Sequence, residues 1–117
     1  MQVPRDAVLL RVFIGESDRY QGGPLFEAIV LKARELHLAG ATVLRGPMSF
    51  GLSSRVHSAK ILRLSEDLPI VIEIVDSKEN IDRFLPQLEI MMGAGVGSGL
   101  VTIEKVQVLR YGAAPTA

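Results

Sequence analysis

The chain of 117 residues contains no cysteine and no tryptophan, and its formal net charge at pH 7 is zero. Without cysteine it can form no disulfide, no thiolate zinc site and no thiol nucleophile. A neutral chain gains no long-range attraction to nucleic acid or to an anionic membrane. No apolar run approaches the roughly 20 residues that span a bilayer, and the N-terminal MQVPRD has no apolar signal region. We therefore expect a soluble, cytoplasmic protein without membrane insertion.

The composition that remains is that of a folded domain. Hydrophobic residues make up 48% of the sequence and charged residues 22%, which is typical of globular proteins. A length of 117 residues suits one domain with one core. The sequence therefore predicts a single domain over 1–117, in which 1–6 and 112–117 are flexible ends.

Hydrophobic periodicity predicts four strands and two helices in the order βαββαβ. The predicted strands are 7–16, 41–46, the segment 59–76 with an interruption at 66–69, and 100–111; the predicted helices are 24–39 and 77–92. Asp76 and Glu79 resemble a capping box, and Pro86 is expected to kink the second helix or to cost it a hydrogen bond. In the last strand the apolar alternation changes phase between Ile103 and Val106, which predicts a bulge or a strand that leaves the sheet.

This order is that of a ferredoxin-like α+β fold, an antiparallel sheet with two helices on one face. The other face of the sheet is apolar too, because the first and third strands place Leu9, Phe13, Val71 and Val75 on it. A monomer would expose these side chains to water. The sequence therefore predicts a homo-oligomer.

Aromatic side chains make up only 5% of the chain. RNA-recognition domains of this fold class stack bases on aromatic side chains of the open sheet face, where this chain offers only Phe13. Together with the neutral charge, this predicts no nucleic-acid partner.

Two polar, glycine-rich segments are candidate binding loops: 46–58 after the second strand, and 93–99 (GAGVGSG) before the last. A long loop in a compact domain is usually functional. Glycines let backbone N–H groups approach an anion, and the basic and hydroxyl side chains around the first loop suit phosphate or carboxylate. A flexible connection and a solvated basic loop are the alternative interpretations.

Glu16, Ser17 and Asp18 follow the first strand directly. Carboxylates there suit a metal ion or acid–base chemistry, whereas turn formation accounts for Ser and Asp equally well. His37 and His57 are isolated, and His37 suits the C-terminus of a helix. The sequence contains no Ser/His/Asp set and no metal-binding HExxH.

Three stretches resemble the PII-like domain-of-unknown-function family of bacteria and archaea, namely 9–46, 49–76 and 100–109. They cover nearly the whole chain, and the most specific runs are GATVLRG and RLSEDLPIVIEIVD. That family is similar in fold to the PII signal-transduction proteins. Those proteins are trimers that bind ATP or ADP in clefts between subunits, and a mobile loop between their second and third strands blocks or releases target proteins.

The resemblance implies a regulatory homotrimer and not an enzyme, with no required cofactor. It would bind ATP, ADP, AMP or another small anion in its subunit clefts and act through the loop 46–58 on an unidentified target protein. The ligand-binding residues implied in this way are Arg45, Gly46, Arg55, His57, Lys60, Gly95, Gly97 and Gly99. The chain departs from the PII pattern in two respects. Gly95 and Leu100 stand where PII proteins grip phosphate with basic side chains, and the loop 46–58 lacks the tyrosine that is uridylylated in enteric relatives.

Two other functions stay open on the same trimeric scaffold. One is a metal-binding protein or small metabolic enzyme that uses Glu16, Asp18 and His57. The other is a structural oligomer without a ligand.

Overall fold

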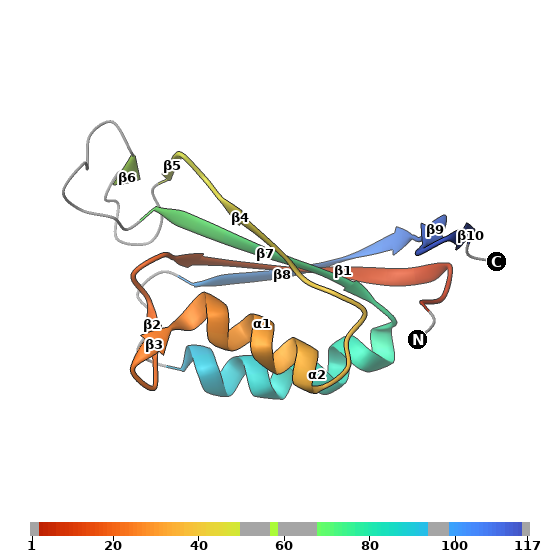
Figure 1. The fold of residues 1–117 in the computed structure, drawn as a ribbon, viewed down its shortest axis with the longest axis horizontal. Coiled ribbons are helices and arrows are strands. Elements are labelled where there is room, and N and C mark those ends of the chain that lie inside the picture. The colour runs from red at the N-terminus through yellow and green to blue at the C-terminus, as the bar shows by residue number, and fades with distance from the viewer. Residues whose placement is uncertain (1–2, 50–56, 59–67, 94–98, 116–117) are drawn as a thin grey trace.

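The computed structural model describes residues 3–49, 57–58, 68–93 and 99–115. One antiparallel sheet contains β1 (Asp6–Gly15), β4 (Thr42–Arg45), β7 (Pro69–Asp76) and β8 (Leu100–Gln107), in the order β4-β7-β1-β8. The helices α1 (Leu25–Glu35) and α2 (Lys78–Met92) both lie against one face of this sheet (Figure 1). The predicted ferredoxin-like α+β fold is therefore confirmed.

Three short two-stranded elements extend this framework. They are β2 (Arg19–Tyr20) with β3 (Gly23–Pro24), β5 (Met48–Ser49) with β6 (His57–Ser58), and β9 (Arg110–Tyr111) with β10 (Ala114–Pro115). The β5–β6 pair belongs to the predicted loop 46–58, whereas the segment 59–67 lies outside the described residues. The β9–β10 pair includes residues that the sequence assigned to a flexible end.

The core lies between the sheet and the two helices. Alternate residues of β1 and β7 are buried toward the helices, since successive side chains of a strand point to opposite faces. They pack against the apolar stripes of α1 and α2 in one cluster, whose most buried members are Leu10, Val12, Leu25, Ile29, Ile70, Ile72, Ile74, Ile81, Phe84 and Leu88. Neither helix in the described part of the chain is long and apolar enough to cross a membrane.

The helix ends differ from the prediction. α1 ends at Glu35, four residues before the predicted end, because the backbone turns at His37 with a φ of 61°. α2 begins at Lys78, and its N-cap is Ser77, whose hydroxyl accepts a hydrogen bond from the backbone N–H of Asn80 at 3.1 Å. The predicted capping box of Asp76 and Glu79 is therefore wrong. α2 continues through Pro86.

Asp76 is fully buried and joins three parts of the fold. Its carboxylate accepts hydrogen bonds from the backbone N–H of Ala39 at 2.8 Å, from that of Ser77 at 2.7 Å and from the side-chain amide of Asn80 at 3.0 Å. The first donor belongs to the α1–β4 connection and the other two to the start of α2. Asp76 thus fixes the position of both segments at the end of β7.

β8 pairs with β1 in one unbroken register, from Gln107 opposite Asp6 to Leu100 opposite Phe13. The sequence predicted either a bulge in the last strand or a strand that leaves the sheet. β8 contains no bulge, and the strand leaves the sheet. The chain leaves the sheet after Gln107, where the N–H of Val108 donates to the carbonyl of Arg5 at 2.7 Å. It then forms the β9–β10 pair.

The sheet face away from the helices, here called the open face, is covered by no helix of the described residues (Figure 1). Its central row is apolar across all four strands and consists of Leu44, Val71, Phe13 and Leu100. The outer two side chains of this row are 48% and 55% exposed. The apolar second face predicted from the sequence is therefore present.

Candidate functional site

The two predicted binding loops leave the sheet at the same end. Arg45, the last residue of β4, pairs with Ile70 near the start of β7, which in turn pairs with Ile14 near the end of β1. Leu100, the first residue of β8, pairs with Phe13 in the adjacent row. We call this edge the loop end of the sheet; Figure 1 shows both connections starting from it.

Arg45 forms an ion pair with Glu16 at the loop end. Glu16 follows β1, and its side chain is 24% exposed, whereas that of Arg45 is 54% exposed. Arg45, a predicted ligand-binding residue, is therefore in contact with Glu16, which the sequence analysis considered for the alternative metal or enzyme site.

The connection between β4 and β7, residues 46–68, includes the loop 46–58 and is here called the long loop; backbone hydrogen bonds hold both of its ends. The N–H of Gly46 donates to the carbonyl of Pro69 at 2.8 Å, and the N–H of Glu16 donates to the carbonyl of Leu68 at 2.8 Å. Arg45 and Glu16 thus sit beside the first and last residues of this loop. Their ion pair closes its base.

A side chain at Gly46 would meet the ring of Pro69, so we expect Gly46→Ala to destabilise the protein. A Cβ at this position would lie 2.8 Å from Cγ of Pro69. Overpacking of this kind costs about 1–3 kcal/mol. Gly40→Ala is the matched control, since a Cβ there meets nothing within 4 Å. Chemical denaturation should show a lower midpoint for the first variant only, and equal midpoints would contradict the contact.

The other predicted ligand residues are only partly placed. Gly99 immediately precedes β8 at the loop end, and it is exposed. His57 pairs with Ser49 through the β5–β6 backbone. Four of the predicted residues lie outside the described residues: Arg55, Lys60, Gly95 and Gly97. The structure thus brings Arg45, Gly46 and Gly99 to one end of the sheet.

Asp18 shapes the turn after β1. Its carboxylate accepts the N–H of Gly15 at 2.8 Å, and its carbonyl accepts the N–H of Leu25 at 2.8 Å. Within the described residues no three His, Asp or Glu side chains are grouped so as to hold a metal ion. These contacts favour the turn interpretation of Asp18.

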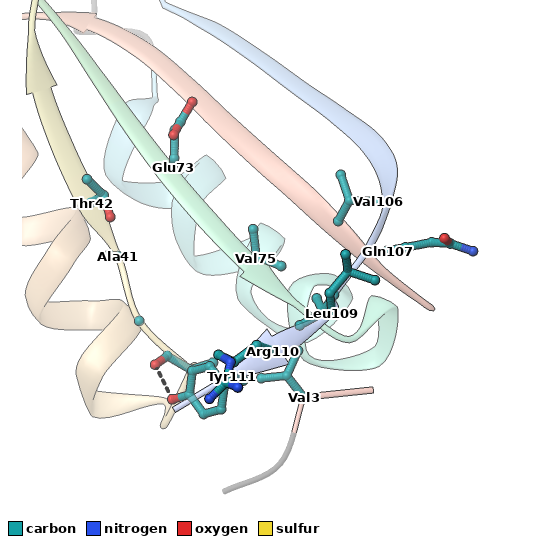
Figure 2. Close-up of a pocket in the computed structure, with 13 residues that line it drawn as sticks. Val3, Ala41, Thr42, Glu73, Val75, Val106, Gln107, Leu109, Arg110 and Tyr111 are labelled. Atoms are coloured by element: carbon teal, nitrogen blue, oxygen red, sulfur yellow. Dashed lines mark hydrogen bonds between the residues drawn. The ribbon is translucent and has the colours of Figure 1, made fainter. Parts of the chain in front are cut away.

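A cavity of about 670 Å³ lies at the opposite end of the open face (Figure 2). We call this the hairpin end, because the β9–β10 pair forms one wall and the connection 39–41 forms another. The floor is apolar, with Val75 and Val106, and Leu109 closes one side. Such a volume is in the range of small-molecule sites.

The polar groups of this cavity come from distant parts of the chain. They are Thr42, Glu73, Gln107, Arg110 and Tyr111. The Tyr111 hydroxyl donates to the carbonyl of Ala39 at 2.7 Å, drawn as a dashed line in Figure 2, and this bond ties the hairpin to the wall opposite. A cation, an amide and hydroxyls around an apolar floor suit a planar ligand with polar groups, and the carboxylate of Glu73, which pairs with Arg11, adds a negative charge to the lining.

Sequence reasoning missed this cavity. Its walls are separated by about sixty to seventy positions in the chain, so no local pattern joins them. One signal was available: the change of apolar phase between Ile103 and Val106 places Val106 on the open face, where it forms part of the cavity floor.

Arg11 connects three strands beside the cavity. It donates to Glu73 on β7 at 2.9 Å and to Glu104 on β8 at 2.5 Å. These hydrogen bonds, first that of Glu73, raise the pKa of Arg11 above its ordinary value, so the guanidinium stays charged. Arg11, Glu73 and Glu104 together carry one net negative charge on the open face.

The fold is that of PII-like proteins, as similarity to solved structures shows. CPII from Thiomonas intermedia K12, bound to ADP, AMP and bicarbonate, superposes with a TM-score of 0.68 over 90% of each chain at 16% identity. The GlnK–ATP complex of B. subtilis gives a TM-score of 0.58 over 90% of this chain and 85% of GlnK, at 12% identity.

The chain belongs to the DUF190 family, whose model is described as "Uncharacterized ACR" and matches residues 7–108. A UPF0166 protein of Aquifex aeolicus (strain VF5) is 36% identical over 101 residues, which cover 86% of this chain and 91% of that protein. Another, from Methanocaldococcus jannaschii, is 37% identical over 82 residues, which cover 70% and 75% of the two chains. The family resemblance found in the sequence is confirmed.

Proposed function

We propose that this chain is a PII-like ligand-sensing protein that acts as a homotrimer and binds an adenine nucleotide at clefts between subunits. It signals to a target protein through the loop 46–58. The observation that carries this proposal is the fold likeness to CPII with ADP and AMP bound and to GlnK with ATP bound. Fold alone does not fix a ligand, so the residues of this chain supply the rest of the argument.

The cationic groups suited to a nucleotide are divided between the two ends of the sheet. Arg45 lies in the row of Ile14, whereas the cavity residue Val106 pairs with Ala7. Seven residues of β1 separate these rows, which is about 23 Å of strand. A single small ligand does not reach Arg45 and Arg110 of the same chain. It reaches both only if the loop end of one copy meets the hairpin end of another.

The open face supports such an assembly. Its central apolar row is covered by neither helix, and burial of apolar surface is what drives subunits together. A closed ring of three copies would cover this face and place each loop end beside a neighbour's cavity. The loop 46–58, which begins directly after Arg45, would then respond to the ligand at its base.

Nucleotide binding is tested by thermal unfolding with ATP, ADP and AMP. A ligand at 100 times its dissociation constant stabilises the folded state by about 2.7 kcal/mol. We expect Arg45→Ala and Arg110→Ala each to weaken binding by about tenfold to a hundredfold, since each removes a charge-assisted hydrogen bond. Lys32→Ala is the control, because Lys32 pairs with Glu35 on the surface of α1. No shift with any of the three nucleotides would refute the proposal.

A mixing experiment tests whether the cleft lies between copies. Arg45→Ala chains have an intact hairpin end, and Arg110→Ala chains have an intact loop end. Trimers assembled from both contain some clefts with both arginines, so nucleotide binding should partly return. If the mixture binds no better than either variant alone, the two arginines do not share a ligand across subunits.

A further inference from the structure

Arg45 is not a free cation in this structure. Its guanidinium donates to the carboxylate of Glu16, and the backbone of Glu16 is held in place, because its N–H donates to the carbonyl of Leu68 at 2.8 Å. The Glu16 side chain is also the more buried member of the pair, at 24% exposed against 54% for Arg45. The less exposed carboxylate of Glu16, on a backbone that is hydrogen-bonded to Leu68, is therefore the acceptor that Arg45 uses in this structure.

We infer that Glu16 is an internal competitor for Arg45, which an anionic ligand must displace before it can bind. This inference rests on the proposed function, since it concerns the arginine assigned to the nucleotide cleft. A carboxylate and a phosphate oxygen accept the same guanidinium donors in the same geometry. The two acceptors therefore exclude one another wherever the ligand uses the donors that Glu16 now holds.

Displacement has a structural consequence at the base of the long loop. The ion pair is the side-chain contact that joins the end of β4 to the residue after β1, and it lies beside the backbone bonds of Gly46 to Pro69 and of Glu16 to Leu68. When the ligand takes Arg45, the two backbone bonds remain and the side-chain contact is lost. Ligand binding thereby exchanges a contact within the chain for a contact to the ligand, which couples the site to the base of this loop.

Removal of the competitor should strengthen binding. An exposed ion pair contributes little in water, and the lost repulsion between Glu16 and an anionic ligand adds to it. We expect Glu16→Gln to lower the dissociation constant of ATP by about threefold to tenfold. The glutamine keeps the size of the side chain, so the fold at the end of β1 is preserved.

Three variants separate competition from a general effect of charge. Glu35→Gln removes the same charge from the surface of α1, where Glu35 pairs with Lys32 at 3.1 Å, and should leave ATP affinity unchanged. Glu16→Ala should act as Glu16→Gln does, which guards against an effect of the new amide. In an Arg45→Ala background, Glu16→Gln should have a smaller effect, because nothing is left to compete for.

Isothermal titration with ATP reports the outcome for each variant. Tighter binding by both Glu16 variants, with no change for Glu35→Gln, supports the inference. If wild type binds ATP and the Glu16 variants bind it equally or more weakly, Glu16 is no competitor and the inference is overturned, while the proposed function stands. If neither wild type nor the Glu16 variants bind ATP, ADP or AMP, the proposed function fails, and the inference fails with it.

Discussion

Replacement of Asp76 by alanine is expected to lower the free energy of unfolding by about 3 kcal/mol or more. The carboxylate is fully buried and accepts three hydrogen bonds, so its removal leaves the N–H groups of Ala39 and Ser77 and the amide of Asn80 without this acceptor. Each buried polar group that loses its partner costs about 1–3 kcal/mol. For a domain of this size the melting temperature should fall by about 12 °C or more.

Asp82→Ala is the control for this prediction. Asp82 pairs with Lys78 at 2.8 Å on the exposed side of α2, and a surface pair of this kind contributes less than about 0.5 kcal/mol. Asp76→Asn should be intermediate, because the amide keeps one acceptor oxygen but presents N–H groups to a backbone donor. A melting temperature for Asp76→Ala within 2–4 °C of wild type, roughly that of a surface substitution, would contradict the structural role of Asp76.

The second large effect is expected at the open face. Phe13→Lys places a charge in the central apolar row, between Val71 and Leu100. In the proposed trimer this charge would be buried without a partner, which opposes assembly strongly. The variant should therefore have the chain mass of 12.7 kDa, whereas wild type should have roughly three times this mass by light scattering.

The matched control for assembly is Ile90→Lys. Ile90 is 64% exposed on α2, away from the open face, so its replacement should leave the oligomer intact. Circular dichroism checks that the Phe13 variant still folds, as expected for a side chain outside the helix-covered core. A wild-type protein that is a monomer, or a Phe13 variant that keeps the oligomer mass, would refute assembly through this face.

The framework could be predicted because its signals are local. Alternation along β1 and β7 and helical spacing in α1 and α2 each lie within about fifteen residues, and both faces of the sheet followed from them. The end of α1 was predicted too late because Gly40 is typical of the position after a helix, whereas the chain has already turned at His37. The positive φ of His37 cannot be recognised from the hydrophobic periodicity of the sequence.

The burial of Asp76 had a signal that sequence reasoning did not use. Asp76 occupies the same alternate position of β7 as Ile70, Ile72 and Ile74, all of which are buried. An acidic residue in that position needs donors nearby, and these come from Ala39 and Asn80. The cavity could not be predicted in this way, because it depends on residues that only the folded chain brings together.

The two ends of the sheet are held by contacts of different kinds, and this makes them sensitive to different conditions. At the hairpin end, Tyr111 bonds to the carbonyl of Ala39, whose N–H bonds in turn to buried Asp76. At the loop end, the closing side-chain contact is an ion pair between Arg45 and Glu16, which are partly in water. Dissolved salt screens exposed charges over about 8 Å at physiological ionic strength and scarcely affects hydrogen bonds of uncharged or buried groups. A rise in ionic strength therefore weakens the ion pair at the base of the long loop and leaves the hydrogen bond between Tyr111 and Ala39 unaltered.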